Sequence, residues 1–340
     1  MTYHIELTTR DNGHFSFDCA PDQDLLTAAA NASLTLPSQC RKGSCGACSA
    51  TVTHGRYEAK EHNADVLPAG EGAVLMCSTT PRSDLRIALP YDEARVLLHS
   101  VPRRSTSIVA LETIARNTLR LELQIEPDAD GGCAAEFEPG QFMEIEIPGS
   151  DDRRPFSLAN TSNWDGRLEF LIRLQPGGRF SSYLRERAKP GDTLTVQGPA
   201  GAFGIRDDSL RERWFVAGGT GVAPILSMLR RMAEFQEAQP ARLFFGVTGE
   251  DELFVQDELD SLTAQLPQLK VELCVWKAQP DWTGFHGTPT DALRAALASA
   301  GVQPDLYVCG PSALVSETQK IIAEFGIPAT QFETERFTSA

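Results

Sequence analysis

Four cysteines in this 340-residue chain have the spacing of an electron-transfer centre. Cys40, Cys45 and Cys48 form a C-x4-C-x2-C run, and Cys77 follows farther along the chain. This is the plant-type spacing for a [2Fe–2S] cluster, in which four cysteine thiolates hold two irons. Two glycines inside the run would let its backbone curl tightly and aim N–H groups at sulfur. The spacing therefore predicts four metal ligands and the transfer of single electrons.

Two other uses of these cysteines fit the sequence less well. A structural zinc site usually has two C-x2-C knuckles, and this chain has one. Disulfide frameworks are typical of short secreted chains. This chain is long, and its strand-like start predicts no signal peptide. We expect most of the remaining cysteines to be buried and to pack as small apolar side chains. These cysteines are Cys19, Cys133, Cys274 and Cys309.

A glycine-rich turn predicts a nucleotide site. Gly219, Thr220 and Gly221 follow a short apolar run at residues 214–217 and precede a helical pattern. Glycines at such a turn let the backbone approach a pyrophosphate, which then lies at the positive end of the helix. Pro224 stands where a Rossmann motif has its third glycine, so the turn departs from that motif. A plain tight turn would use the same residues, and the strand–helix position favours the nucleotide interpretation.

An acidic residue after the next apolar strand bears on the choice of nucleotide. Glu250 follows the strand predicted at residues 243–247, with no arginine or lysine near it in the sequence. A carboxylate at this point can bind a ribose 2′-hydroxyl and repels a 2′-phosphate. The sequence therefore predicts NADH as the nucleotide. Capping of the following helix is the alternative role, and both roles can hold together.

A segment in the middle of the chain carries a flavin motif. Arg154, Pro155, Phe156 and Ser157 fit the R-x-[YF]-S pattern, with Leu158 directly after it, and here the chain resembles the ferredoxin–NADP reductase-like flavoproteins. In that family the arginine faces the FAD diphosphate, the aromatic ring packs on the flavin, and the serine hydroxyl lies near flavin N5. An arginine fork suits phosphate and an aromatic face suits the flavin ring. The resemblance implies FAD as a cofactor and a catalytic role for the serine.

The same resemblance covers further residues. Without the resemblance, each of these segments would be interpreted as a turn whose arginine is hydrogen-bonded to neighbouring groups. With it, cofactor binding is implied for a group of residues before and after a Pro-Gly-Gly turn: Arg173, Gly177, Gly178, Phe180, Ser181 and Ser182.

The family also carries a C-G-P motif and a near-terminal aromatic residue. Cys309, Gly310 and Pro311 match the motif, whose cysteine lies near nicotinamide C4 in the family. Phe337 is the candidate for the aromatic that covers the flavin until nicotinamide displaces it. Anchoring of the chain end in an apolar groove is the alternative role for Phe337. The resemblance thus implies catalytic roles for Ser157, Cys309 and Phe337.

The order of the motifs narrows the resemblance to one group. A ferredoxin-like segment before the flavin and nucleotide segments resembles the reductases of multicomponent oxygenases. Those of soluble di-iron monooxygenases, of the methane and short-alkane or alkene types, are the most similar. The reductases of phenol hydroxylases and of benzoate-type dioxygenases remain alternative interpretations. The resemblance implies electron flow from NADH through FAD and the [2Fe–2S] cluster to a di-iron hydroxylase, which docks transiently on the ferredoxin domain.

Composition limits the remaining function classes. The formal net charge is −15 and the pI is near 4.9, which disfavours a nucleic-acid partner because a phosphate backbone attracts basic surfaces. No apolar run reaches the roughly 18 residues that span a bilayer, so we expect no membrane partner. We expect a monomer in the cytoplasm, where thiols stay reduced.

Three domains and a linker are needed to position these residues. Residues 1–93 show a ββαβ pattern around the cysteine run and predict a plant-type ferredoxin domain of the α+β, β-grasp class. After a linker at 94–104, alternating strands and Pro-Gly turns at 105–208 predict an antiparallel FAD-binding β-barrel. Strand–helix alternation at 209–340 predicts a parallel-sheet α/β NAD-binding domain, with a helix at 251–265.

Overall fold

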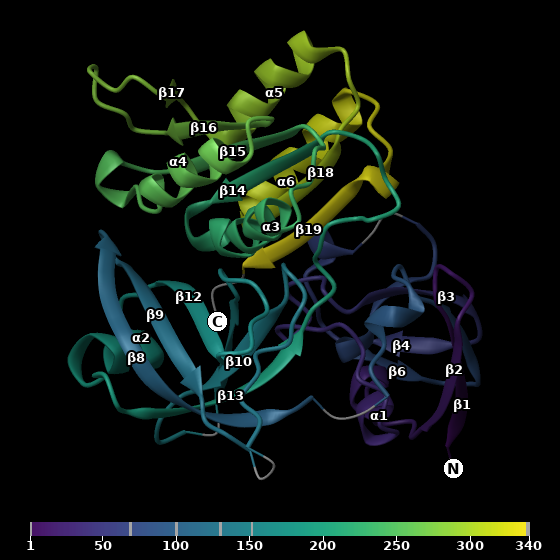
Figure 1. Cartoon of the computed structure of the whole chain (residues 1–340). Coiled ribbons are helices and arrows are strands. Elements are labelled where there is room, and N and C mark those ends of the chain that lie inside the picture. The colour runs from purple at the N-terminus through teal and green to yellow at the C-terminus, as the bar shows by residue number, and fades with distance from the viewer. Residues whose placement is uncertain (1, 68–69, 99–100, 129–130, 151, 338–340) are drawn as a thin grey trace. The chain divides into compact units, whose positions relative to one another are not determined.

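The computed structural model describes every residue except 1, 68–69, 99–100, 129–130, 151 and 338–340 (Figure 1). The chain divides into two compact units, one holding most of residues 1–102 and the other most of residues 103–337. Residues 99–100 of the predicted linker lie outside the described residues. The four-part division of the chain remains a prediction.

The N-terminal unit, most of residues 1–102, is a small mixed sheet with one helix. Its strands follow the order β2-β1-β7-β3-β5, with β1 and β7 parallel and the other pairs antiparallel, and β4 pairs separately with β6. Ile5 and Leu7 alternate with polar residues in β1 and are fully buried. The elements are β1 (Tyr3–Thr8), β2 (His14–Cys19), α1 (Leu25–Asn31), β3 (Ser49–His54), β4 (Tyr57–Ala59), β5 (Ala73–Leu75), β6 (Thr79–Pro81) and β7 (Leu85–Ala88).

The second unit begins with a barrel, the term used below for β8 to β13. Its strand order is β11-β10-β13-β8-β9-β12. An antiparallel bridge between Leu158 and Phe170 joins the chain after β11 to β12 at the other edge. The elements are β8 (Arg103–Ala115), β9 (Thr118–Ile125), β10 (Phe142–Glu146), β11 (Arg153–Ser157), β12 (Arg167–Arg173), α2 (Arg179–Glu186) and β13 (Thr193–Ala200).

The rest of the second unit is an α/β lobe, the term used for β14 to β19. Its six strands are all parallel, in the order β17-β16-β15-β14-β18-β19. The elements are β14 (Arg213–Gly218), α3 (Val222–Glu234), β15 (Ala241–Val247), α4 (Gln256–Gln265), β16 (Leu269–Val275), β17 (Phe285–His286), α5 (Pro289–Ala300), β18 (Asp305–Pro311), α6 (Ser312–Glu324) and β19 (Phe332–Phe337).

Helices cover both faces of this parallel sheet (Figure 1). Leu226 of α3 and Leu259 of α4 belong to one buried apolar cluster, while Leu293 of α5 and Ile321 of α6 belong to another. Burial on both faces explains why the strands read as continuous apolar runs. The predicted fold class, with a ferredoxin-like unit, an antiparallel barrel and a parallel α/β sheet, is confirmed.

Two details differ from the sequence-based expectation. The helix expected at residues 251–265 starts at Gln256, because Glu250–Glu252 form a 3-10 turn and Val255 takes a left-handed φ of 54°. The last strand, β19, had no clear pattern in the sequence, since exposed and buried residues do not alternate along it.

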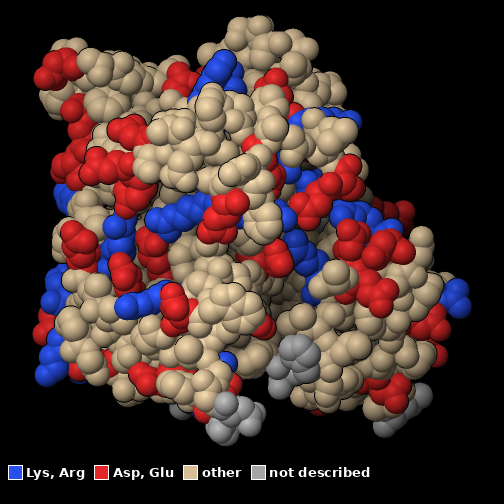
Figure 2. Space-filling model, viewed as in Figure 1, with Lys and Arg blue, Asp and Glu red and all other residues tan. Residues whose placement is uncertain are grey.

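Two properties of the surface and helices are plain. Acidic and basic side chains are interspersed over the face shown in Figure 2. Within the described part of the chain, every helix is too short or too polar to cross a bilayer.

Candidate active site

The cysteine loop directs its own backbone N–H groups toward sulfur. The amides of Lys42 and Ser44 each lie 3.4 Å from Cys40 Sγ. The amide of Ala47 lies 3.5 Å from Cys45 Sγ. Amide donors of this kind stabilise negative charge on sulfur and are one of the factors that set a cluster's reduction potential.

Glycine is required at two points of this loop. Gly43 and Gly46 have φ values of 71° and 82°, in the left-handed region. A Cβ at Gly43 would lie 3.0 Å from His62, and one at Gly46 would lie 3.0 Å from the carbonyl oxygen of Val66. Larger residues would therefore strain the backbone and push the loop away from its neighbours.

The four predicted ligands form two pairs. A hydrogen bond from the Cys45 thiol lowers the pKa of Cys40 to about 4, and one from Cys48 lowers the pKa of Cys77. Burial and the same contacts raise the pKa values of Cys45 and Cys48. Among the described residues, no group of three or more His, Cys, Asp or Glu side chains is arranged to hold a single metal ion. Two thiol pairs with amide donors fit a two-iron cluster.

The predicted flavin residues lie along β11 and at the start of α2. Phe156 is half-buried, and its ring centroid lies 5.5 Å from that of Phe180. Arg154 is half-buried and donates to the carbonyl of Arg153 at 2.8 Å. Leu158 is fully buried and points into the barrel core. A ring and a guanidinium at the barrel surface can bind a flavin and its diphosphate, while the Leu158 side chain supports the strand from within.

The Pro-Gly-Gly turn precedes α2. Gly178 is the N-cap of the helix, and the space around the Cα of Gly177 is open. Ser181 Oγ accepts from the amide of Gln175 at 2.9 Å, and the amide of Ser182 donates to the carbonyl of Gly178. A helix start with free space beside it suits a phosphate, so the residues present fit the diphosphate end of FAD.

A buried carboxylic acid joins the barrel to the α/β lobe. Ser157, at the end of β11, donates to Glu335 Oε2 at 2.7 Å. Cys309, in β18, lies 3.8 Å from the same oxygen. The parallel pairing of β18 with β19 sets Cys309 directly opposite Glu335. Two of the three predicted catalytic residues are therefore brought together, through a residue that the sequence did not single out.

Burial controls the protonation of the Glu335 carboxyl group and of the Cys309 thiol. It raises the pKa of Glu335 to about 7, because only Ser157 and Cys309 compensate the charge. Burial and the neighbouring carboxylate also raise the pKa of Cys309 well above its usual value, so the thiol keeps its proton. A carboxyl group with a pKa near neutrality can both take and release a proton.

Replacing Glu335 with glutamine should stabilise the protein only at higher pH. The folded pKa of about 7 exceeds the ordinary value of 4.5, so the folded state binds an extra proton between these values. Wild-type stability therefore falls as pH rises from about 4.5 to about 7 and then levels off. Glu335→Gln has no carboxyl group to titrate, so it does not lose this free energy of unfolding, which is on the order of 3 kcal/mol. Melting temperatures at pH 5 and pH 8 measure the difference.

The same substitution at Glu333, two residues earlier on β19, is the control for loss of a charge, because Glu333 is more exposed. A stability gain of Glu335→Gln that is equal at pH 5 and pH 8 would contradict the raised pKa.

The third predicted catalytic residue, Phe337, lies on the same face of β19 as Glu335, two residues farther along. It is half-buried against the apolar cluster that contains Ala217 and Cys309. This position is compatible with the predicted cover over a flavin face and also with an anchoring role.

The glycine turn packs closely against the C-G-P motif. A Cβ at Gly221 would lie 2.3 Å from the carbonyl oxygen of Cys309, and Gly310 takes a φ of 148° beside Gly218. Pro311 is the N-cap of α6. Gly219 and Thr220 lie in the 3-10 turn before α3. The glycines thus let two strand ends approach each other where a dinucleotide would lie.

Glu250 lies at the carboxyl end of β15, apart from this turn. Its Oε1 accepts from the amide of Gln279 at 2.8 Å. The fold brings Arg116 to within 3.1 Å of Asp251, the residue that follows Glu250. Lys277 also pairs its amide with the carbonyl of Thr248. Local sequence could not show these neighbours, which come from other elements.

Glu252 is a further residue that the sequence did not single out. It is buried and accepts from Arg116 of the barrel at 2.6 Å, and it lies 3.7 Å from Arg173. Burial raises its pKa, but the bond from Arg116 and the charge of Arg173 lower it overall. A Cβ at Gly219 would lie 3.7 Å from Arg173 Nη1, so Glu252 holds a predicted cofactor residue beside the glycine turn.

Comparisons with protein families agree with this division of sites. Residues 9–82 match the 2Fe-2S iron-sulfur cluster binding domain. Residues 105–205 match the oxidoreductase FAD-binding domain, and residues 215–320 match the oxidoreductase NAD-binding domain. The cysteine loop, the flavin motif and the glycine turn each fall within the corresponding match.

Similarity to individual proteins extends over nearly the whole chain. It is 39% identical over 299 residues to methane monooxygenase component C of Methylosinus trichosporium, covering 87% of each chain. It is 35% identical to the ferredoxin–NAD(+) reductase component of the alkene monooxygenase system of Xanthobacter autotrophicus, covering 96% and 99%. It is 32% identical to the toluate 1,2-dioxygenase electron transfer component of Pseudomonas putida, covering 100% of each.

Among solved structures, a cytochrome P450 reductase of Amycolatopsis superposes with a TM-score of 0.75 at 27% identity, covering 98% of this chain and 99% of that one. The ferredoxin reductase in carbazole 1,9a-dioxygenase superposes with a TM-score of 0.70 at 25% identity, covering 99% of each.

Proposed function

Because the chain belongs to the family of ferredoxin–NADP reductase-like reductase components of multicomponent oxygenases, we propose that it passes electrons from NADH to the di-iron hydroxylase of a hydrocarbon monooxygenase. The observation that carries the proposal is the hydrogen-bonded group Ser157–Glu335–Cys309, which joins the flavin motif to the nucleotide lobe. Electron transfer to a ring-hydroxylating dioxygenase or a phenol hydroxylase is the alternative. The higher identity to the methane monooxygenase component favours the first.

The chemistry of the cofactors requires a donor and an acceptor site in one chain. FAD takes a hydride from NADH and releases electrons singly, and a [2Fe–2S] cluster accepts them one at a time. Arg154 and the start of α2 would hold the FAD diphosphate, and Phe156 would pack against the ring. Gly219, Thr220 and Gly221 would hold the pyrophosphate of NADH, while Glu250 would bind its ribose.

The buried group supplies a proton site at the reacting end of the cofactors. Ser157 Oγ would lie near flavin N5, and its hydroxyl donates a hydrogen bond to Glu335 Oε2. Cys309 keeps its thiol proton and donates to the same oxygen. Phe337 would shield this point from water until nicotinamide takes its place. These residues orient the cofactors and hold the proton; the redox chemistry belongs to the cofactors.

The electrons leave through the N-terminal unit. We propose that Cys40, Cys45, Cys48 and Cys77 hold the cluster and that this unit docks transiently on the hydroxylase. A monomer acting in the cytoplasm suits this role, since thiol ligands need a reducing compartment. The net charge of −15 would speed encounter with a partner that presents basic residues.

The direct test mixes the purified holoprotein with NADH. Flavin and cluster absorbance should bleach, and cytochrome c should be reduced catalytically. No reduction of cytochrome c would reject the reductase function. Reconstitution with a methane- or alkene-type hydroxylase, in parallel with a benzoate-type dioxygenase, then identifies the partner by NADH-dependent substrate turnover.

Replacing Glu250 with arginine should improve the use of NADPH. The change removes a charge that repels a 2′-phosphate and adds one that binds it. We expect the ratio of kcat/KM for NADPH over NADH to rise by about tenfold or more, equivalent to about 1.4 kcal/mol. Asp251→Arg is the matched control, because Asp251 already pairs with Arg116. An unchanged ratio in Glu250→Arg would remove Glu250 from the ribose site.

A further inference from the structure

One face of α3 holds the chain that follows the flavin motif. Ser227 Oγ donates to the carbonyl of Asn160 at 2.6 Å, and Arg230 Nη1 donates to the carbonyl of Ala159 at 2.9 Å. Residues three positions apart lie on one side of a helix, so both donors face the same strand. That strand carries Ser157 only two residues earlier.

The same face continues for another turn of the helix. Glu234, four residues beyond Arg230, accepts from the hydroxyl of Thr161. Three successive residues of the barrel, Ala159 to Thr161, are therefore each held by a different residue of α3. Because α3 begins directly after the glycine turn, this helix spans the distance between the predicted nucleotide turn and the flavin strand.

Arg230 also enters a chain of alternating charges between the barrel and the α/β lobe. It bonds to Glu169 of β12 at 2.6 Å, and Glu169 lies 3.3 Å from Arg120 of β9. Arg120 in turn bonds to Glu258 of α4. All four side chains are at least 72% buried, so each charge depends on its neighbours for compensation.

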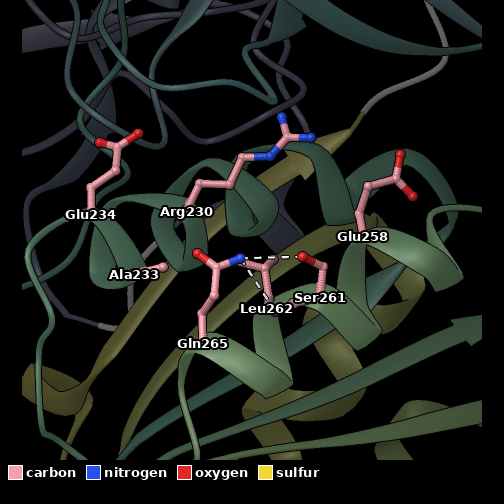
Figure 3. Close-up of a pocket in the computed structure, with 7 residues that line it drawn as sticks. All are labelled: Arg230, Ala233, Glu234, Glu258, Ser261, Leu262 and Gln265. Atoms are coloured by element: carbon pink, nitrogen blue, oxygen red, sulfur yellow. Dashed lines mark hydrogen bonds between the residues drawn. The ribbon is translucent and has the colours of Figure 1, made fainter.

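The side chain of Arg230 reaches across to the barrel beside an open space. Figure 3 shows it extending from α3 with its guanidinium away from the helix, while Glu258 rises from α4. Both border a cavity of about 330 Å³ between α3 and α4. An uncharged side chain of similar length therefore fits at this position without displacing its neighbours.

We propose that Arg230 is a positioning residue for hydride transfer: it fixes the strand that carries Ser157 at a set distance from the glycine turn and from Cys309. The inference rests on the proposed function. Displacement of reacting groups by about 1 Å can lower a rate about 10²-fold. A loosened strand would thus slow the reaction step without weakening the binding of NADH, whose contacts lie at the other end of α3.

Arg230→Met tests this role against Arg231→Met. The two arginines are adjacent on α3 and equally exposed, at 25%, but Arg231 faces Asp207 and the ring of Phe235. We expect the limiting rate of flavin bleaching by NADH to fall at least about tenfold in Arg230→Met, with the apparent Kd for NADH unchanged within about twofold. Arg231→Met should match the wild type in both.

A readout that needs no turnover is the rate at which Cys309 is alkylated, followed by mapping of the labelled peptide. Cys309 is fully buried, and Ser157 bonds to the same carboxyl oxygen of Glu335 that Cys309 contacts. Loosening of the strand that carries Ser157 should therefore speed labelling of Cys309 about tenfold in Arg230→Met, and Arg231→Met should leave the labelling rate unchanged. Arg230→Lys retains the charge and should recover most of both effects.

The possible outcomes separate the two proposals. If wild-type protein is not bleached by NADH, the proposed function fails, and Cys309 labelling still tests the positioning role. If wild-type protein is bleached and Arg230→Met behaves like Arg231→Met in rate and labelling, the positioning role is rejected. Should Arg230→Met fail to fold, the same comparison is made with Arg230→Leu, for which wild-type rate, Kd and labelling would also reject it.

Discussion

Replacing Cys45 with alanine should abolish the visible absorbance of the [2Fe–2S] cluster while NADH still bleaches the flavin. The cluster needs four thiolates, and Cys45 supplies one from a buried position whose sulfur receives a backbone amide. Loss of an outer partner of a metal site alone can cost ~100-fold, so cytochrome c reduction should fall by at least that factor. Absorbance spectra, iron content and stopped-flow traces measure the three quantities.

Cys19→Ala is the matched control in the same unit. Cys19 is fully buried, and its thiol donates to the nearby carbonyls of Ala20 and Gln23. The cluster should survive this change. Flavin reduction in Cys45→Ala also tests whether the cluster site and the flavin site are independent, because the N-terminal unit and the barrel have separate apolar cores. If Cys45→Ala also loses flavin reduction, the two cofactor sites do not work as separate modules.

Replacing Ser157 with alanine should slow flavin reduction by about 10²-fold while FAD stays bound. Ser157 is buried, and its hydroxyl is the link between the flavin strand and Glu335. The hydride carries its own hydrogen to the flavin, so the loss is one of placement: without the hydroxyl, the flavin strand is no longer held to Glu335. Displacement of reacting groups by about 1 Å can lower a rate about 10²-fold. Stopped-flow bleaching at saturating NADH measures the rate, and the FAD-to-protein absorbance ratio measures binding.

Ser162→Ala is the control on the same stretch of chain. Its hydroxyl donates to the carbonyl of Ala135 and has no contact with the buried carboxyl group. It should bleach at the wild-type rate. A Ser157→Ala protein that bleaches as fast as this control would show that the Ser157–Glu335 hydrogen bond does not position the flavin strand for hydride transfer.

Much of the cofactor chemistry could be predicted because it depends on short stretches of chain. The spacing of Cys40, Cys45 and Cys48 predicts a short loop, and the backbone amides of that loop point at sulfur. The alternating strands and buried runs likewise predicted the fold class, since periodicity reports directly which faces are buried.

Residues that act through distant partners could not be found in this way. Glu335 lies in a strand with no clear alternation, and its partner Ser157 is 178 positions away. Glu252 stood beside Glu250 and Asp251 as one of three acidic residues, and only the approach of Arg116 distinguishes it. Arg230 is one of two adjacent arginines, Arg230 and Arg231, and its bonds to Ala159 and Glu169 distinguish it.

The short motifs, together with the family resemblance that they carry, predict which cofactors the chain holds, because each motif constrains backbone shape and donor type over a few residues. Which carboxyl group lies beside these motifs depends on the packing of distant strands. The parallel register of β18 and β19 sets Glu335 opposite Cys309, and the packing of the barrel on the α/β lobe brings Ser157 to the same oxygen. Burial at that meeting point then raises the pKa of Glu335 to about 7.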